Sequence, residues 1–245
     1  MTEPHECARE RTNRDSRDII MGKYSIVINR FKVASRRNIE SFALELLSHA
    51  YTEDEGWGYY DVVRKNDLIY SILQKRTPVY YSVWNEEQQQ LERQLIQVIR
   101  EVPFEMDFSK GFLVAEGTNA QMNLVKQCFR QSFWGELVYE SLDFIPYDYV
   151  SMFSKDGILS SINEITINDF QYEGILLGRY IAHMTSPIDI EEKLAEHSKN
   201  IVRARMSIIM GGEQCEISVN NHNVLSVVCS DGVKSEFIDY LKRIF

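Results

Sequence analysis

The chain of 245 residues is poor in the residues that build specialised scaffolds, with four cysteines, five prolines and twelve glycines. Cys7, Cys128, Cys215 and Cys229 form no C-x-x-C pair and are too dispersed for a zinc site or a disulfide framework. The apolar runs are too short to span a bilayer, and the N-terminus lacks the continuous apolar segment of a signal peptide. We therefore expect no membrane association, and a location in the cytoplasm or another reducing compartment.

Motifs of catalysis and cofactor binding are also missing. No serine lies in a G-x-S-x-G turn, and Gly211-Gly212 is not followed by the Lys-Ser/Thr pair of a phosphate-binding loop. The five histidines show no i, i+4 pairing that would indicate a metal site. We expect neither a cofactor nor a bound metal.

The net charge of −9 is distributed unevenly. Residues 1–37 contain nine basic and five acidic residues, whereas the remainder contains 18 basic and 31 acidic residues. An acidic body repels polyanions, so any phosphate contacts would be confined to a local patch. Residues 1–22 are charged and have no hydrophobic periodicity, which predicts a flexible N-terminal arm.

Hydrophobic periodicity predicts strands and helices over most of the remaining chain. Apolar residues at helical spacing predict a helix over 39–50, and Thr118 is a predicted cap for a helix that continues to Phe133. Residues 85–102 combine Asn85 and following glutamates with a later alternating pattern, so we expect a short helix followed by a strand. Further strands are predicted over 67–76, 78–84, 112–116, 201–210 and 224–229, and helices over 187–198 and 233–244.

The two halves of the chain show the same succession of patterns. Strand 112–116, with an acid-glycine turn and a helix after it, resembles strand 224–229 with Asp231-Gly232 and the last helix. We predict an α+β fold of two similar tandem units, 23–135 and 136–245, with a mainly antiparallel sheet and helices packed on one side. This plan resembles saddle-like folds built from two similar halves, a likeness of fold that implies no activity.

The segment from Trp57 to Trp84 has the most unusual composition, with seven aromatic residues in 28 positions. Four basic residues accompany two acidic ones, so the segment is locally basic. Such residues fit half-buried strands, a protein interface, or a surface that stacks on single-stranded nucleic acid. The candidate binding surface comprises Trp57, Tyr59, Tyr60, Arg64, Lys65, Lys75, Arg76, Tyr80 and Trp84. Tyr80, Ser82 and Trp84 share one face of their strand by parity.

A weaker pattern allows catalysis. Glu116-Gly117 follows a predicted strand, as an acidic metal ligand of some nucleic-acid enzymes does, and Asp107 and Lys126 lie near it in the sequence. The expected paired carboxylates are missing, and a tight turn explains the glycine equally well.

These observations favour a non-catalytic binding or adaptor subunit of a larger assembly. We expect it to contact a protein partner, with nucleic acid as an additional ligand, through the aromatic and basic segment. The alternative is a metal-dependent nuclease or phosphotransfer enzyme that uses Asp107, Glu116 and Lys126.

Overall fold

A computed structural model describes residues 21–35, 37–172, 176–183 and 194–245. Residues 1–20 of the predicted N-terminal arm, and the predicted helix 187–198 before residue 194, lie outside the described residues. Within the described ranges, no helix combines the length and the apolar character needed to cross a bilayer.

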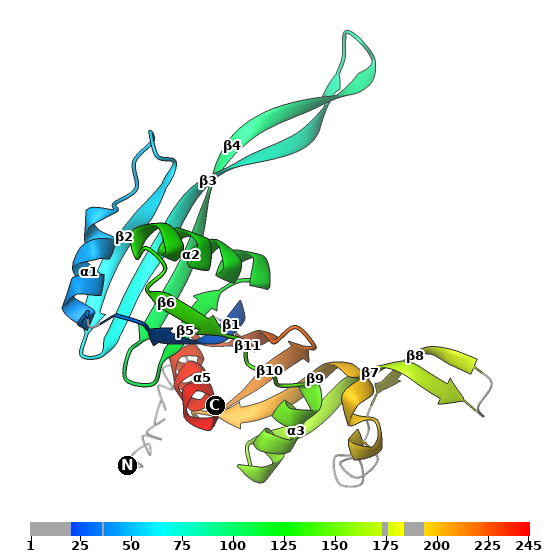
Figure 1. The fold of residues 1–245 in the computed structure, drawn as a ribbon. Helices are drawn as coiled ribbons and strands as arrows, with labels where there is room; N and C mark the ends of the chain where they lie inside the picture. The colour runs from blue at the N-terminus through cyan, green and yellow to red at the C-terminus, as the bar shows by residue number, and fades with distance from the viewer. Residues whose placement is uncertain (1–20, 36, 173–175, 184–193) are drawn as a thin grey trace, which may run out of the picture.

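The chain forms a mainly antiparallel sheet flanked by helices, as predicted for an α+β protein (Figure 1). The sheet order is β2-β3-β4-β5-β1-β11-β10-β9-β7-β8, and β6 pairs with β1 beside this path. The strands are β1 (Gly22–Val33), β2 (Trp57–Lys65), β3 (Leu68–Asn85), β4 (Gln90–Asp107), β5 (Phe112–Glu116), β6 (Leu137–Glu140), β7 (Leu159–Tyr172), β8 (Leu176–His183), β9 (Ile201–Met210), β10 (Glu213–Asn220) and β11 (Val224–Cys229). The helices are α1 (Ile39–Ser48), α2 (Asn119–Ser132), α3 (Pro146–Lys155), η1 (Ser198–Asn200) and α5 (Asp231–Ile244).

The central strands are buried on both faces. Val27 of β1 and Leu113 of β5 belong to a core cluster with α1 and α2, whereas Ile26 and Val114 belong to a second cluster with α3 and α5. Neighbouring residues of a strand point to opposite faces of the sheet. Helices therefore cover both faces, and the prediction that they pack on one side was wrong. The continuous apolar run Phe112–Ala115 is typical of a strand buried on both faces.

Several predicted elements are confirmed to the residue. These are strands β5, β9 and β11 and the start of α2 after Thr118, where the Gln121 side chain accepts the Thr118 backbone N–H. Helix α3 was not predicted, although Pro146 occupies its first turn and the Asp148 carboxylate accepts the Ile145 N–H. Both are helix-start signals in the sequence.

The prediction for residues 85–102 was wrong in its first part. Asn85 ends β3, and β4 is a single strand from Gln90 to Asp107. The Asn85 Oδ1 atom accepts the backbone N–H groups of Glu87 and Gln88, and Gln89 adopts a positive φ of 49°. The side chain that indicated a helix cap therefore closes a hairpin turn instead.

Candidate binding surface

A long hairpin extends from the sheet, and in the part of the chain that the structure describes no other strand lies beside its far end (Figure 1). Strand β2 pairs with β3 only as far as Lys75, and β5 pairs with β4 only from Phe104. Strands β3 and β4 pair with each other from Leu68 and Asp107 out to Asn85 and Gln90. Residues 76–99 therefore form a two-stranded ribbon, here called the distal hairpin.

The distal hairpin has one face that is richer in exposed rings. The uninterrupted register places Arg76, Pro78, Tyr80 and Trp84 on the same face as their partners on β4. Tyr80 and Trp84 are 57% and 56% exposed, and Leu91 is 66% exposed. We call this the Tyr80/Trp84 face, which comprises Arg76, Pro78, Tyr80, Ser82, Trp84, Leu91, Arg93, Leu95, Gln97 and Ile99.

Side chains of the distal hairpin hold one another in place. The Arg93 guanidinium lies over the Tyr80 ring at 4.4 Å from its centroid, and the Tyr81 hydroxyl donates to Gln94 Oε1 at 3.1 Å. At the tip, the Asn85 side-chain amide donates to Glu92 Oε1 at 2.7 Å. These contacts order a ribbon that carries no core residue of its own, since neither core cluster contains a residue between 76 and 101.

The nine predicted surface residues do not form one surface. Arg76, Tyr80 and Trp84 lie on the Tyr80/Trp84 face, whereas Arg64 and Lys65 lie at the opposite end of β2. Arg64 is already paired there, with its Nη1 atom 2.7 Å from Glu40 Oε1.

Tyr59 is a correction, because it is 1% exposed and belongs to the core. Its hydroxyl lies 3.1 Å from Ser132 Oγ, and burial raises its pKa. Trp57 is half-buried, with its ring stacked on His49 at a centroid distance of 6.0 Å. These rings match the interpretation of aromatic residues as strand packing.

The rest of the predicted set lies at the root of the distal hairpin. Lys75 pairs with Trp57 on the face covered by α2, and Tyr60 pairs with Ile72 on the opposite face. The pKa of Tyr60 is raised by partial burial and then by the charge of Glu101. Both side chains are half-buried, so neither contributes to the exposed ribbon.

Sequence reasoning missed the contribution of β4 to this surface. Leu91, Arg93, Leu95 and Ile99 all lie on the Tyr80/Trp84 face. The period of two that is typical of a strand therefore extends back to Leu91, into the segment where we expected a short helix. The distal hairpin contains two arginines and the three glutamates Glu86, Glu87 and Glu92, a net charge of 2 − 3 = −1. The turn residues Glu86 and Glu87 therefore outweigh the positive charge of Arg76, since Glu92 and Arg93 of β4 balance each other.

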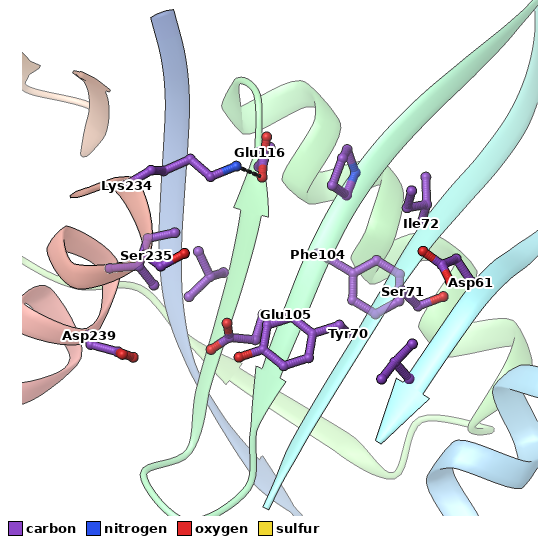
Figure 2. Close-up of a pocket in the computed structure, with 14 residues that line it drawn as sticks. Asp61, Tyr70, Ser71, Ile72, Phe104, Glu105, Glu116, Lys234, Ser235 and Asp239 are labelled. Carbon is purple, nitrogen blue, oxygen red and sulfur yellow. Dashed lines mark hydrogen bonds and ion pairs between the residues drawn. The ribbon is translucent and has the colours of Figure 1, made fainter. Parts of the chain in front are cut away.

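A second feature is a cavity of about 300 Å³ at the seam between the N-terminal half of the sheet and α5 (Figure 2). Its apolar wall includes Val63, Ile72 and Ile238. Four acidic residues and one lysine also line it, and that lysine, Lys234, is 2.7 Å from Glu116 Oε1. The lining residues are Asp61, Val63, Tyr70, Ser71, Ile72, Pro103, Phe104, Glu105, Val114, Glu116, Lys234, Ser235, Ile238 and Asp239.

Buried charges hold α5 to the sheet beside this cavity. The Lys242 Nζ atom donates to Glu105, and it lies 3.1 Å from Asp239 Oδ1 and 3.6 Å from Asp107 Oδ2. Burial by itself lowers the pKa of Lys242, but hydrogen bonds and charges from Glu105 and Asp239 outweigh burial, so the pKa is raised. Burial, followed by the charge of Glu105, raises the pKa of Tyr70 to about 12. The cluster links α5 to β4.

The alternative catalytic residues are not assembled into one site. Asp107 and Glu116 lie on the face toward α5, whereas Lys126 is on α2 against the other face. Lys126 Nζ donates to Asn29 Oδ1 at 2.7 Å, and burial, followed by the charge of Arg130, lowers its pKa. Asp107 accepts hydrogen bonds from Ser109 and Lys110 in a tight turn. Within the described ranges, no group of three or more His, Cys, Asp or Glu side chains could hold a metal ion.

No protein-family model matches this chain, and no curated protein is detectably similar to it.

Proposed function

We propose that this protein is a non-catalytic binding subunit of a larger assembly and that it contacts a protein partner through the Tyr80/Trp84 face. The observation that carries the proposal is the exposure of several large apolar side chains on one face of a projecting ribbon. An isolated two-stranded ribbon is at best marginally stable in water, so a partner that covers this face would stabilise it. Large exposed apolar patches on folded proteins mark interaction sites.

The types of residue on this face match those that dominate protein interfaces. Tyrosine, tryptophan and arginine are enriched where binding energy is concentrated, and here Arg93 is already positioned over Tyr80. This contact reduces the conformational freedom that both side chains would otherwise lose on binding.

Charge favours protein over nucleic acid as the main ligand. The distal hairpin has a net charge of −1 and the whole chain −9, so neither would be drawn to a phosphate backbone. Arg76 and Arg93 beside exposed rings leave base stacking as a secondary role.

The test is capture of partners from an extract of the native organism by the full chain and by a Tyr80→Ala/Trp84→Ala variant. Trp134→Ala is a matched control, since Trp134 is 83% exposed and lies outside the distal hairpin. We expect at least a tenfold loss of the specific partner with the double variant and no loss with the control, because truncating two interface anchors costs about 1–2 kcal/mol each. Equal capture by all three proteins, with unchanged circular dichroism, would refute the proposal. Labelled single-stranded DNA and RNA serve as the comparison for nucleic acid.

We also infer that the chain contains two similar units, divided between α2 and β6. The order of elements supports this: β1, α1, four strands and α2 are followed by β6, α3, five strands and α5, with β8 as the additional strand in the described part. From the centre outward, the sheet order β5-β4-β3-β2 corresponds to β11-β10-β9-β7. The first strand of each half lies in a different place, since β1 lies between β5 and β11 whereas β6 pairs with β1 beside this path.

A reducing compartment is consistent with the state of the thiols. Cys128, Cys215 and Cys229 are free and buried, and burial raises the pKa of Cys128 to about 11.

A further inference from the structure

Among the described residues, the outer edge of β4 is a long strand edge without a partner. Strand β5 occupies this side of β4 only from Phe104 to Asp107, so Gln90 to Pro103 form a free edge (Figure 1). No register shift interrupts this stretch, and no proline or lysine lies between Gln90 and Val102. Natural proteins usually protect exposed edges with such features, and an unprotected edge is a template for another strand.

The other edge of the distal hairpin is protected. The Arg76 N–H donates to the Gly56 carbonyl oxygen at 2.7 Å, so the backbone groups of Arg76 point away from β4. Backbone direction alternates along a strand, and Pro78 therefore occupies the next outward position of β3, where it has no N–H to offer. The free edge of β4 also has a proline at an outward position, Pro103, but this residue lies at its inner end, so six outward residues remain on β4 against three beyond Pro78 on β3. The longer uninterrupted edge therefore favours β4 as the edge that pairs.

The same hydrogen bond defines which residues of β4 face outward. Arg76 pairs with Ile99, so the N–H and C=O groups of Ile99 also point outward, together with those of every second residue along β4. Asp107 follows the same alternation, since its carbonyl oxygen points outward to the β5 side and accepts the Gly111 N–H at 2.8 Å. The outward residues of the free edge are Leu91, Arg93, Leu95, Gln97, Ile99, Glu101 and Pro103.

We propose that the free edge of β4 pairs with the same edge of a second copy of this chain, antiparallel and centred on Gln97. This inference rests on the proposed role of the distal hairpin in binding and names a second copy as one of its partners. The centre at Gln97 places Arg93 opposite Glu101 of the second copy, and Leu95 opposite its Ile99. On the other face, Ile96 lies opposite Val98. On the Tyr80/Trp84 face, apolar residues thus meet apolar residues and each Arg93 meets a Glu101, whereas on the other face Glu92 lies opposite Val102 and Arg100 lies opposite Gln94.

The two nearest alternative registers towards Ile96 are less complementary. A centre between Ile96 and Gln97 would place Arg93 opposite Arg100 and Glu92 opposite Glu101, and it would also match outward residues with inward ones. A centre at Ile96 places Leu91 opposite Glu101 and Leu95 opposite Gln97, so apolar contacts are lost. The pairing centred on Gln97 forms about twelve backbone hydrogen bonds, as many as a typical protein interface contains.

Arg93 and Glu101 lie eight residues apart on one strand, about 27 Å, so they cannot pair within one copy. In the single chain, Glu101 accepts from Gln74 Nε2 at 3.0 Å. A two-fold axis at Gln97 brings the two charges together twice in each dimer. The pairing extends the Tyr80/Trp84 face over four strands, since the axis keeps this face of both copies on the same side.

The first experiment measures the mass of the full chain by light scattering and sedimentation over a range of concentrations. We expect a dimer of about 57 kDa, twice the 28.6 kDa of the chain. Arg93→Glu and Glu101→Arg should each weaken dimerisation by about tenfold or more, because each places two like-charge pairs in the dimer. The double variant Arg93→Glu/Glu101→Arg should restore it. Gln74→Ala controls for loss of the hydrogen bond within the chain and should leave the dimer intact.

The second experiment tests the register in a Cys7→Ser background. Gln97→Cys should form a disulfide between copies under mild oxidation, since a directly opposite hydrogen-bonded pair has Cα atoms about 5.5 Å apart. Gln94→Cys is the matched control, because its neighbour is Arg100 of the second copy, and it should not cross-link.

A chain that is monomeric at every concentration, a dimer that neither charge reversal weakens, or equal cross-linking at positions 94 and 97 would overturn this inference. The proposed function is tested separately, because Tyr80→Ala/Trp84→Ala alters β3 and should leave the dimer mass unchanged. Loss of partner capture with an intact dimer would locate the other partner on the face. A monomer that still captures its partner through Tyr80 and Trp84 would refute the inference alone.

Discussion

Removing the charge of Lys242 is the most direct test of how α5 is held to the sheet. The Lys242 side chain is 1% exposed, and it contacts Glu105 and Asp107, whose side chains are 12% and 5% exposed. Lys242→Met keeps most of the aliphatic stem but leaves two buried carboxylates without their cation. Breaking one partner of a buried ion pair costs about 3–5 kcal/mol, a large part of a total stability of about 5–15 kcal/mol.

This loss converts into a measurable change in melting temperature. In a chain of this length, 1 kcal/mol corresponds to about 2–4 °C, so Lys242→Met should melt about 6–20 °C lower. Urea unfolding followed by circular dichroism should show a lower midpoint with an unchanged slope. Lys242→Met/Glu105→Gln should recover part of the loss, because a neutral amide needs no counter-charge.

The control is Lys32→Met, which removes an exposed pair. Lys32 and Glu140 have side chains that are 69% and 45% exposed, so their pair should contribute less than about 1 kcal/mol. If Lys242→Met is no more destabilising than Lys32→Met, then the Lys242 cluster is solvated and the reasoning about buried charge fails.

Three further predictions follow from the core and the hairpin. Burial raises the pKa of Tyr59, Tyr139 and Tyr149, so these phenols keep their protons in the folded state at pH values where the unfolded chain loses them. Their ionisation should therefore leave the free energy of unfolding unchanged below about pH 10 and lower it as the pH rises further. Urea titrations at several pH values would measure this change. Tyr59→Phe should lower the free energy of unfolding by about 1 kcal/mol, because it removes the hydrogen bond to the fully buried Ser132, and it should leave partner capture unchanged. Weaker capture without a change in stability would place Tyr59 in the binding surface. Replacing residues 77–98 by Asn-Gly should abolish partner capture and dimerisation. It should change the free energy of unfolding by less than about 1 kcal/mol, because the distal hairpin contributes no residue to either core cluster. A collapse of the circular dichroism spectrum would show instead that the distal hairpin is needed for folding.

The sequence alone determined many of the local elements of this protein. Strand β5 and the start of α2 depend on an apolar run and a cap that lie within a few residues of each other, and β11 likewise depends on a short apolar run. Asn85 and the glutamates and glutamines after it were misleading. The Asn85 side-chain oxygen can accept the backbone N–H groups of a helix start or, as here, those of a hairpin turn. This local signal does not distinguish the two outcomes, because both begin with the same side-chain contact to the following backbone.

Only the tertiary structure decided where the candidate surface lies. Tyr59 and Tyr80 are the same residue type in adjacent strands, yet Tyr59 is sealed beneath α2, whereas Tyr80 is 57% exposed with the Arg93 guanidinium over its ring. The difference arises because β2 and β5 end before the distal hairpin begins, and strand length in a neighbour is not encoded near Tyr80. The distribution of helices over both faces likewise depends on which half of the chain supplies each face of β1 and β5, a long-range property that no local pattern specifies.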